Sequence, residues 1–118
     1  MYDIKPLVNQ KLSEIVGDDK VSDEFNPDYE NLPYITFYEL LNTDPYKLKE
    51  ELYTEIVIQV DIWHNRSTGS LARQVNEAMN SIGLKREFAR DISEPSGIKR
   101  KTMRFRGVIN NKTLIMYQ

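Results

Sequence analysis

The sequence contains no cysteine and a single histidine, His64. Without cysteine, neither a disulfide framework nor a thiolate zinc site can form, and Cys–His catalysis is excluded. A serine triad would have His64 as its one candidate base, but its place at the end of a predicted strand is more typical of a surface histidine. No pair stands out among the eighteen acidic residues. The sequence therefore predicts a protein that is not an enzyme and that uses no metal or cofactor.

Glycine is also scarce. None of the five glycines belongs to a phosphate-binding or dinucleotide-binding loop pattern. The Ser-Thr-Gly-Ser run at 67–70 could present backbone amides to an anion, but an ordinary helix start explains it more simply. No apolar run approaches the roughly 18 residues of a membrane span, and no basic region followed by an apolar run opens the chain. We therefore expect no membrane partner and a cytoplasmic site of synthesis.

The chain is long enough for one hydrophobic core. It has 118 residues, of which 40% are hydrophobic, and this size is typical of a single domain. We expect one domain over residues 1–118.

Hydrophobic periodicity predicts the elements. Apolar residues at helical spacing predict amphipathic helices over 3–16 and 71–82, ended by Gly17 and Gly83. Aromatic, β-branched and alternating patterns predict strands over 34–40, 53–64, 84–92, 98–109 and 113–117. Residues 18–33 are acidic and contain two prolines, which favours a solvated loop with a short strand around Val21, or a segment that becomes ordered on a partner.

The fold class that buries every apolar stripe is α+β. We predict a mixed, largely antiparallel sheet of four to six strands with two amphipathic helices on one face. In the strand over 53–64, Ile56, Ile58, Val60 and Ile62 would face the helices, so the alternate residues would face away.

The face turned away from the helices supplies the candidate functional residues. Tyrosine, tryptophan and arginine are enriched at protein interfaces. The candidate interface or channel-lining residues are Tyr34, Tyr38, Trp63, Arg100, Arg104 and Arg106. One interpretation is a contact face for another protein or a second subunit. The other is a set of cross-strand pairs in which Glu55 and Asp61 neutralise the arginines.

Charge is distributed unevenly along the chain, although its net value is only −2. Residues 1–59 hold 13 acids and 5 bases, whereas residues 60–118 hold 5 acids and 11 bases. The two halves could neutralise each other within the fold, or like subunits could stack acid to base. A nucleic-acid-binding domain is a third interpretation, because bases on the last long strand alternate with aromatic residues, although the acids of the first half would repel phosphates.

Several segments together resemble a known family. They are Pro33-Tyr34-Ile35-Thr36-Phe37-Tyr38-Glu39, the strand from Tyr53 to Asp61-Ile62-Trp63, the helix from Leu71 to Met79 ending in Gly83, and Lys101-Thr102-Met103-Arg104-Phe105-Arg106. This succession is similar to that of the tail-completion or tail-terminator proteins, which join head and tail in long-tailed bacteriophages and prophages. The resemblance spans nearly the whole chain.

The resemblance implies a function in assembly. Members of that family are small α+β subunits that close into a ring, commonly a hexamer, where the tail tube meets the head connector. The expected partners are copies of the chain itself, tail-tube proteins and head-connector proteins, with non-specific passage of DNA through the lumen left open. The expected location is the virion at its tail–head junction, after assembly in the bacterial host cytoplasm. A neck or head-completion adaptor of the same virus type, or a small nucleic-acid-binding domain using the basic C-terminal strand, is the alternative.

Overall fold

The computed structural model describes residues 3–23, 26–43, 53–110 and 116–117. The elements follow the order α1 (Lys5–Val16), a 3₁₀ turn η1 (Asp18–Lys20), β1 (Val21–Ser22), β2 (Tyr34–Thr43), β3 (Tyr53–His64), α2 (Gly69–Ser81), β4 (Lys85–Ile92), β5 (Lys99–Asn110) and β6 (Met116–Tyr117). Both helices and all the predicted strands are present. Residues 113–115 of the last predicted strand lie outside the described residues.

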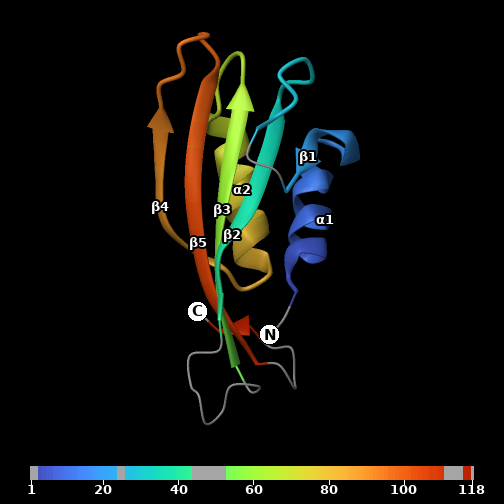
Figure 1. Ribbon diagram of the computed structural model, residues 1–118, viewed down its shortest axis with the longest axis vertical. Helices are drawn as coiled ribbons and strands as arrows, with labels where there is room; N and C mark the ends of the chain where they lie inside the picture. Colours follow the sequence, from blue (N-terminus) through green and yellow to red (C-terminus); the bar gives the residue numbers. More distant parts are fainter. Residues whose placement is uncertain (1–2, 24–25, 44–52, 111–115, 118) are drawn as a thin grey trace.

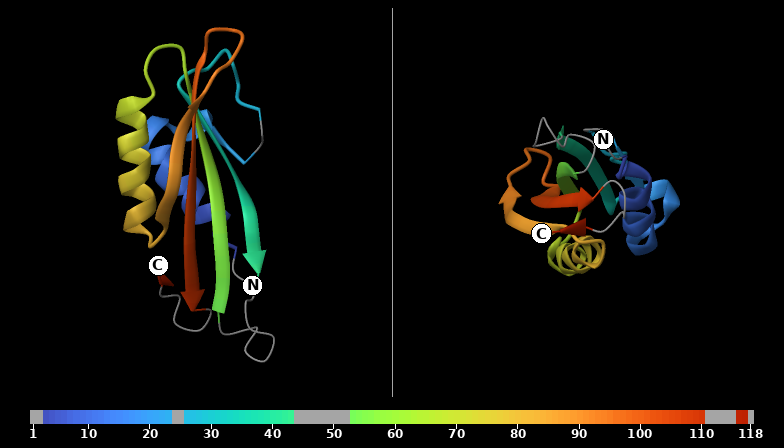
Figure 2. Two further views of the ribbon diagram at one scale, coloured as in Figure 1. Left: turned by 90° about the vertical axis from the view of Figure 1, so that its left-hand side faces the viewer. Right: turned by 90° about the horizontal axis from the view of Figure 1, so that it is seen from below.

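The two helices end where the sequence predicts a stop. Gly17 follows α1 with φ +109°, and its N–H bonds to the carbonyl oxygen of Ser13 at 2.8 Å. After α2, Gly83 takes φ +90° and Leu84 N–H bonds to the carbonyl oxygen of Met79 at 3.0 Å. A left-handed φ suits glycine, because other residues carry a Cβ that clashes there. Both helices lie against one face of the sheet and contact each other (Figures 1 and 2).

The sheet has six strands. Five follow the order β1-β2-β3-β5-β4, and β6 pairs with β5 beyond the end of β4. All pairings are antiparallel except β1 with β2, so the predicted mixed, largely antiparallel sheet is confirmed. β3 and β5 pair along twelve successive positions and form the centre of the sheet. The edge strands of the sheet are β1 at one side and β4 and β6 at the other.

Two register shifts interrupt the outer strand pairs. One lies between Glu39 and Leu41 of β2, and it leaves the side chain of Leu40 45% exposed. The other lies between Arg86 and Phe88 of β4. A bulge turns the following side chains to the opposite face, and this explains why residues 84–92 show no clean alternation in the sequence.

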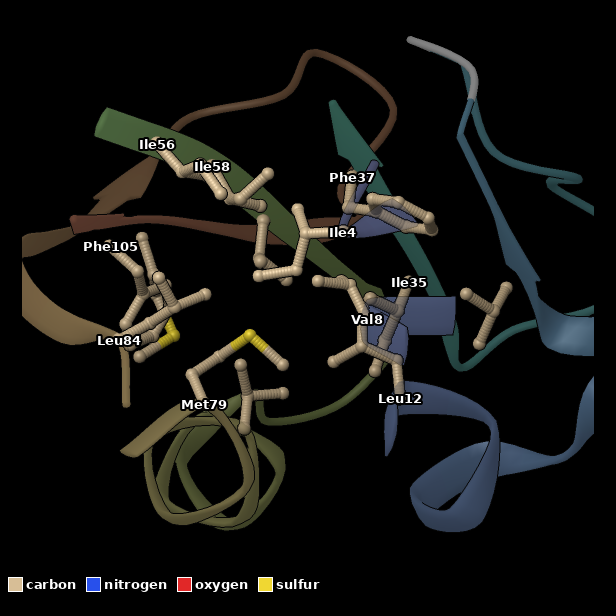
Figure 3. Packing of buried hydrophobic residues seen from close by; sticks show 14 of the residues in the cluster. Ile4, Val8, Leu12, Ile35, Phe37, Ile56, Ile58, Met79, Leu84 and Phe105 are labelled. Atoms are coloured by element: carbon tan, nitrogen blue, oxygen red, sulfur yellow. The ribbon is translucent and has the colours of Figure 1, made fainter. Parts of the chain in front are cut away.

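The core lies between the helices and the inner face of the sheet (Figure 3). The predicted inward set of β3, Ile56, Ile58, Val60 and Ile62, is fully buried. Other buried residues come from both helices, from β1, β2 and β5, and from the positions just before α1 and β4: Ile4, Val8, Leu12, Val21, Ile35, Phe37, Val75, Met79, Leu84, Met103, Phe105 and Ile109. One apolar cluster therefore joins residues from both ends of the described chain.

The acidic segment (residues 18–33) is tied to the fold at several points. It begins with η1 and with β1, which confirms the short strand predicted around Val21. Asn31 Nδ2 donates to the carbonyl oxygen of Asp19 at 2.9 Å, and Asn31 N–H bonds to the carbonyl oxygen of Asp28 at 3.0 Å. The described part of this segment thus runs from the β1 edge back to the start of β2. None of the described helices is long and apolar enough to cross a membrane.

Candidate interaction face

The outer face is the side of the sheet that α1 and α2 do not cover. Register places its residues in cross-strand rows: Tyr34–Trp63–Arg100, then Thr36–Asp61–Thr102, then Tyr38–Gln59–Arg104–Phe88, then Leu41–Val57–Arg106–Lys85. All six candidate residues therefore lie on this face, in the phase that the alternation predicts. Their surroundings differ from one end of the face to the other.

The end of the outer face around Trp63 is closed. Trp63 is 2% exposed, and its indole Nε1 donates to the buried hydroxyl of Thr36 at 3.0 Å. The guanidinium of Arg100 stacks on the indole with 4.6 Å to the ring centroid, and Tyr29 packs edge-on against it at 5.9 Å. Tyr34 is 8% exposed in the same row. The expectation of an uncovered face is wrong at this end, because the acidic segment folds across it.

Arg100 also forms the most buried charge cluster among the described residues. Its Nη2 donates to Asp61 at 3.0 Å and its Nη1 to Glu94 at 3.1 Å, and the Asp61 side chain is fully buried. Burial works to lower the pKa of Arg100, but the hydrogen bonds and charges of Asp61 and Glu94 outweigh it, so its pKa is raised. Arg100 is therefore charged at every ordinary pH and serves as the counter-ion of a buried carboxylate.

The middle row of the outer face is half-open. Tyr38, Gln59 and Arg104 are neighbours across three strands, and Arg104 stacks on Phe88 of β4 with 4.7 Å to the ring centroid. Burial, and then the negative charge of Asp61, raise the pKa of Tyr38 against the opposing effect of Arg100 and Arg104. Arg104 forms no ion pair with any residue that the structure describes. Tyr38 and Arg104 are thus the two predicted residues that lie together and remain accessible.

The last row carries an exposed ion-pair network. Arg106 bonds to Glu55 of β3 through Nη1 and to Glu87 of β4 through Nε, the second at 2.8 Å. The Arg106 side chain is 46% exposed. With Arg100–Asp61, this is the cross-strand pairing that the sequence offered as the alternative to a contact face. Arg100 and Arg106 thus have partners within the sheet, and the contact role of the six residues stays a prediction.

A groove of about 500 Å³ lies beyond the sheet end where α2 begins. Its lining includes Arg66, Thr68, Glu94 and Lys99, so charges of both signs face it. The loop before α2 is closed by local hydrogen bonds: Arg66 N–H donates to His64 Nδ1 at 2.9 Å, and Gly69 N–H to Ser67 Oγ at 3.3 Å. Within the described residues, no three His, Asp or Glu side chains gather as a metal site would require. The His64 side chain thus accepts one of the hydrogen bonds that close this loop.

The sequence patterns did not predict two residues that contact the outer face, Tyr29 and Glu94. Tyr29 belongs to a segment without periodicity, and Glu94 to a Pro-Gly turn, so neither shows which strand residue it contacts. An aromatic residue among acids, four residues before Pro33 and the strand that follows, is the only signal that could have marked Tyr29.

Comparison with known proteins gives one informative likeness. No family model matches the chain, and no curated protein matches it. Among solved structures, the fold is similar to a chain in the virion of a native gene transfer agent particle, with a TM-score of 0.56 and 15% identity. The match covers 84% of this chain and 88% of that one. At this identity, the likeness shows that the two chains share a fold.

Proposed function

We propose that this chain is a structural subunit of a phage-like particle, which completes the tail and joins it to the head connector as a ring oligomer. The observation that carries the proposal is the fold likeness to a virion chain, which extends over most of both chains. It agrees with the family that the sequence resembles along nearly its whole length. Fold alone does not fix function, so the assignment also rests on the chemistry of the surface.

That chemistry favours contact over catalysis. Arg100 and Arg106 bond to carboxylates of the same sheet, and His64 accepts a backbone N–H. Tyr38, Arg104 and Phe88 offer an aromatic and arginine row of the kind found at the centre of protein interfaces.

The test is to look for rings and for tail binding. Size-exclusion chromatography with light scattering should give a mass several times that of the 118-residue chain, and negative-stain electron microscopy should show closed rings. Added to purified tail tubes that lack this subunit, the protein should bind at one end. A protein that stays monomeric at high concentration and leaves tail tubes uncapped would contradict the proposal.

Two neighbouring functions can be separated from this one. A neck or head-completion adaptor would bind the portal end and not the tail tube, and its gene would lie beside a portal gene. A DNA-binding domain, or a ring whose lumen contacts DNA, is favoured by Arg104, which forms no ion pair within the described part of the chain. It predicts an affinity for DNA that falls steeply with salt and drops further with Arg104→Ala.

A further inference from the structure

Two regions of opposite charge lie at opposite sides of the sheet. The acidic segment, 18–33, holds six acids and one base, a net charge of −5. The basic hairpin is defined as residues 85–106, which comprise β4, the connecting turn and β5 as far as Arg106. It holds eight bases and three acids, a net charge of +5. The acidic segment contains β1 and the basic hairpin contains β4, which are the two ends of the strand order (Figure 1).

Among the described residues, no ion pair joins the two regions. The ion pairs of the basic hairpin go to acids of β3, of β4 and of its own turn. The described part of the acidic segment makes one ion pair, Lys5–Asp23 at 3.7 Å. The charges left without an ion pair in the described structure are Asp18, Asp19, Asp28 and Glu30 on one side, and Lys85, Arg86, Arg90, Lys99 and Arg104 on the other. The Arg106–Glu55 pair joins the two halves of the chain, but none of the ion pairs of the described residues joins the acidic segment to the basic hairpin.

The acidic segment presents these carboxylates on an ordered turn. Asp28 accepts the N–H of Glu30 at 3.1 Å, and Asn31 ties the turn to η1. Between the two acids, Tyr29 is 52% exposed while it leans on Trp63. A turn that is held in place before binding loses less conformational entropy when it docks.

The basic hairpin presents a matching surface. Arg90 is exposed two residues after Phe88, on which Arg104 stacks. β4 is an edge strand, so one side of its backbone is not paired within the strand order. Basic residues on an edge strand can also serve only to prevent unwanted pairing, and the experiment below separates that role from docking.

We propose that the acidic segment of one copy docks on the basic hairpin of the next copy. Charge complementarity selects the partner, because the charges of the two regions that have no ion pair among the described residues are mostly opposite in sign. The contact joins two different surfaces of the same chain, so repetition produces a ring when the rotation closes. This inference rests on the proposed function, since it names the surfaces through which the ring subunits meet.

The experiment reverses charge on each surface in turn. Arg86→Glu, Arg90→Glu and Arg104→Glu together make an acidic-hairpin variant, whose hairpin carries a net charge of −1. Asp18→Lys, Asp19→Lys and Glu30→Lys together make a basic-segment variant, whose segment carries a net charge of +1. Each variant alone now carries like charges on both docking surfaces, so its self-association, measured by sedimentation velocity at low salt, should weaken at least about tenfold. An equimolar mixture restores opposite charges at every contact and should recover association close to that of the wild-type protein.

Matched controls keep the result specific. Arg73→Glu and Glu77→Lys reverse exposed charges on α2, outside both surfaces, and should associate as the wild-type protein does. Thermal melts of every variant confirm folding, and the mixture itself reports on folding, because misfolded variants would not restore association. Wild-type association should also weaken as salt is raised from 0.05 to 0.5 M, since exposed charges are screened.

Three outcomes would overturn the inference. They are unchanged association of both reversal variants, a mixture that fails to restore association, and a wild-type protein that stays monomeric at low salt. If the wild-type protein and both variants still form rings that cap tail tubes, the docking surfaces are wrong and the proposed function stands. If the mixture restores rings that never bind a tail tube, the surfaces are right and the proposed function is wrong.

Discussion

Replacing Arg100 by methionine tests whether the closed end of the outer face depends on a buried ion pair. Methionine keeps an unbranched chain against Trp63 but removes the charge that faces Asp61, whose side chain is fully buried. Removing one partner of a buried pair costs about 3–5 kcal/mol, because the remaining charge is left without compensation. For a domain of this size, that corresponds to a fall in Tm of about 12–20 °C.

The matched control is Arg106→Met, six residues further along β5. Arg106 also bonds to two carboxylates, but its side chain is 46% exposed. Water already screens this network, so its loss should cost at most about 1 kcal/mol. The measurement is urea denaturation of both variants at pH 7, followed by circular dichroism. Similar losses near 1 kcal/mol for both variants would refute the reasoning, because Asp61 would then not rely on Arg100.

A double variant sharpens the experiment. Adding Asp61→Asn to Arg100→Met removes the orphaned charge and should recover part of the lost stability.

Three further predictions concern other parts of the fold. Thr36→Val leaves the buried indole N–H of Trp63 without an acceptor, so it should lower the free energy of unfolding in urea by about 1–3 kcal/mol. Thr102→Val removes a buried hydroxyl that has no hydrogen bond in the described structure, and it should cost much less. Met79→Ala opens a cavity beneath α2 and should lower the free energy of unfolding by about 2–5 kcal/mol. Met79→Leu keeps most of the volume and should cost less than about 1.5 kcal/mol, so equal losses for the two variants would contradict close packing there. Burial and the charge of Asp61 raise the pKa of Tyr38, so the folded state favours the protonated phenol. Stability should therefore fall as pH rises above about 10, and Tyr38→Phe should remove that part of the dependence of stability on pH.

Much of the architecture could be predicted from the sequence because periodicity reports which face a residue occupies. The alternation of β3 identified the buried set Ile56, Ile58, Val60 and Ile62 correctly. Helix ends followed from Gly17 and Gly83. These features depend on residues close together in the chain, where geometry leaves few alternatives.

The outer face was harder to predict because its contacts depend on sequence-distant residues. Alternation says that Trp63 points away from the helices, but it does not say that Tyr29, 34 residues earlier, covers it. Likewise, the arginines of β5 look equivalent in the sequence, whereas Arg100 is buried in a charge cluster, Arg106 is exposed in another, and Arg104 has no ion pair in the described structure. Strand order and the position of the β4–β5 turn decide these differences.

The stacking of Trp63 between Arg100 and the acidic segment gives the protein an intrinsic optical probe. Trp63 is the only tryptophan of the chain, so all indole fluorescence comes from the point where the acidic segment crosses the sheet. Its emission should respond when Arg100 is removed or when Tyr29 shifts during docking. Subunit association can therefore be followed in real time on the unlabelled protein, with a reporter two residues from the buried carboxylate of Asp61.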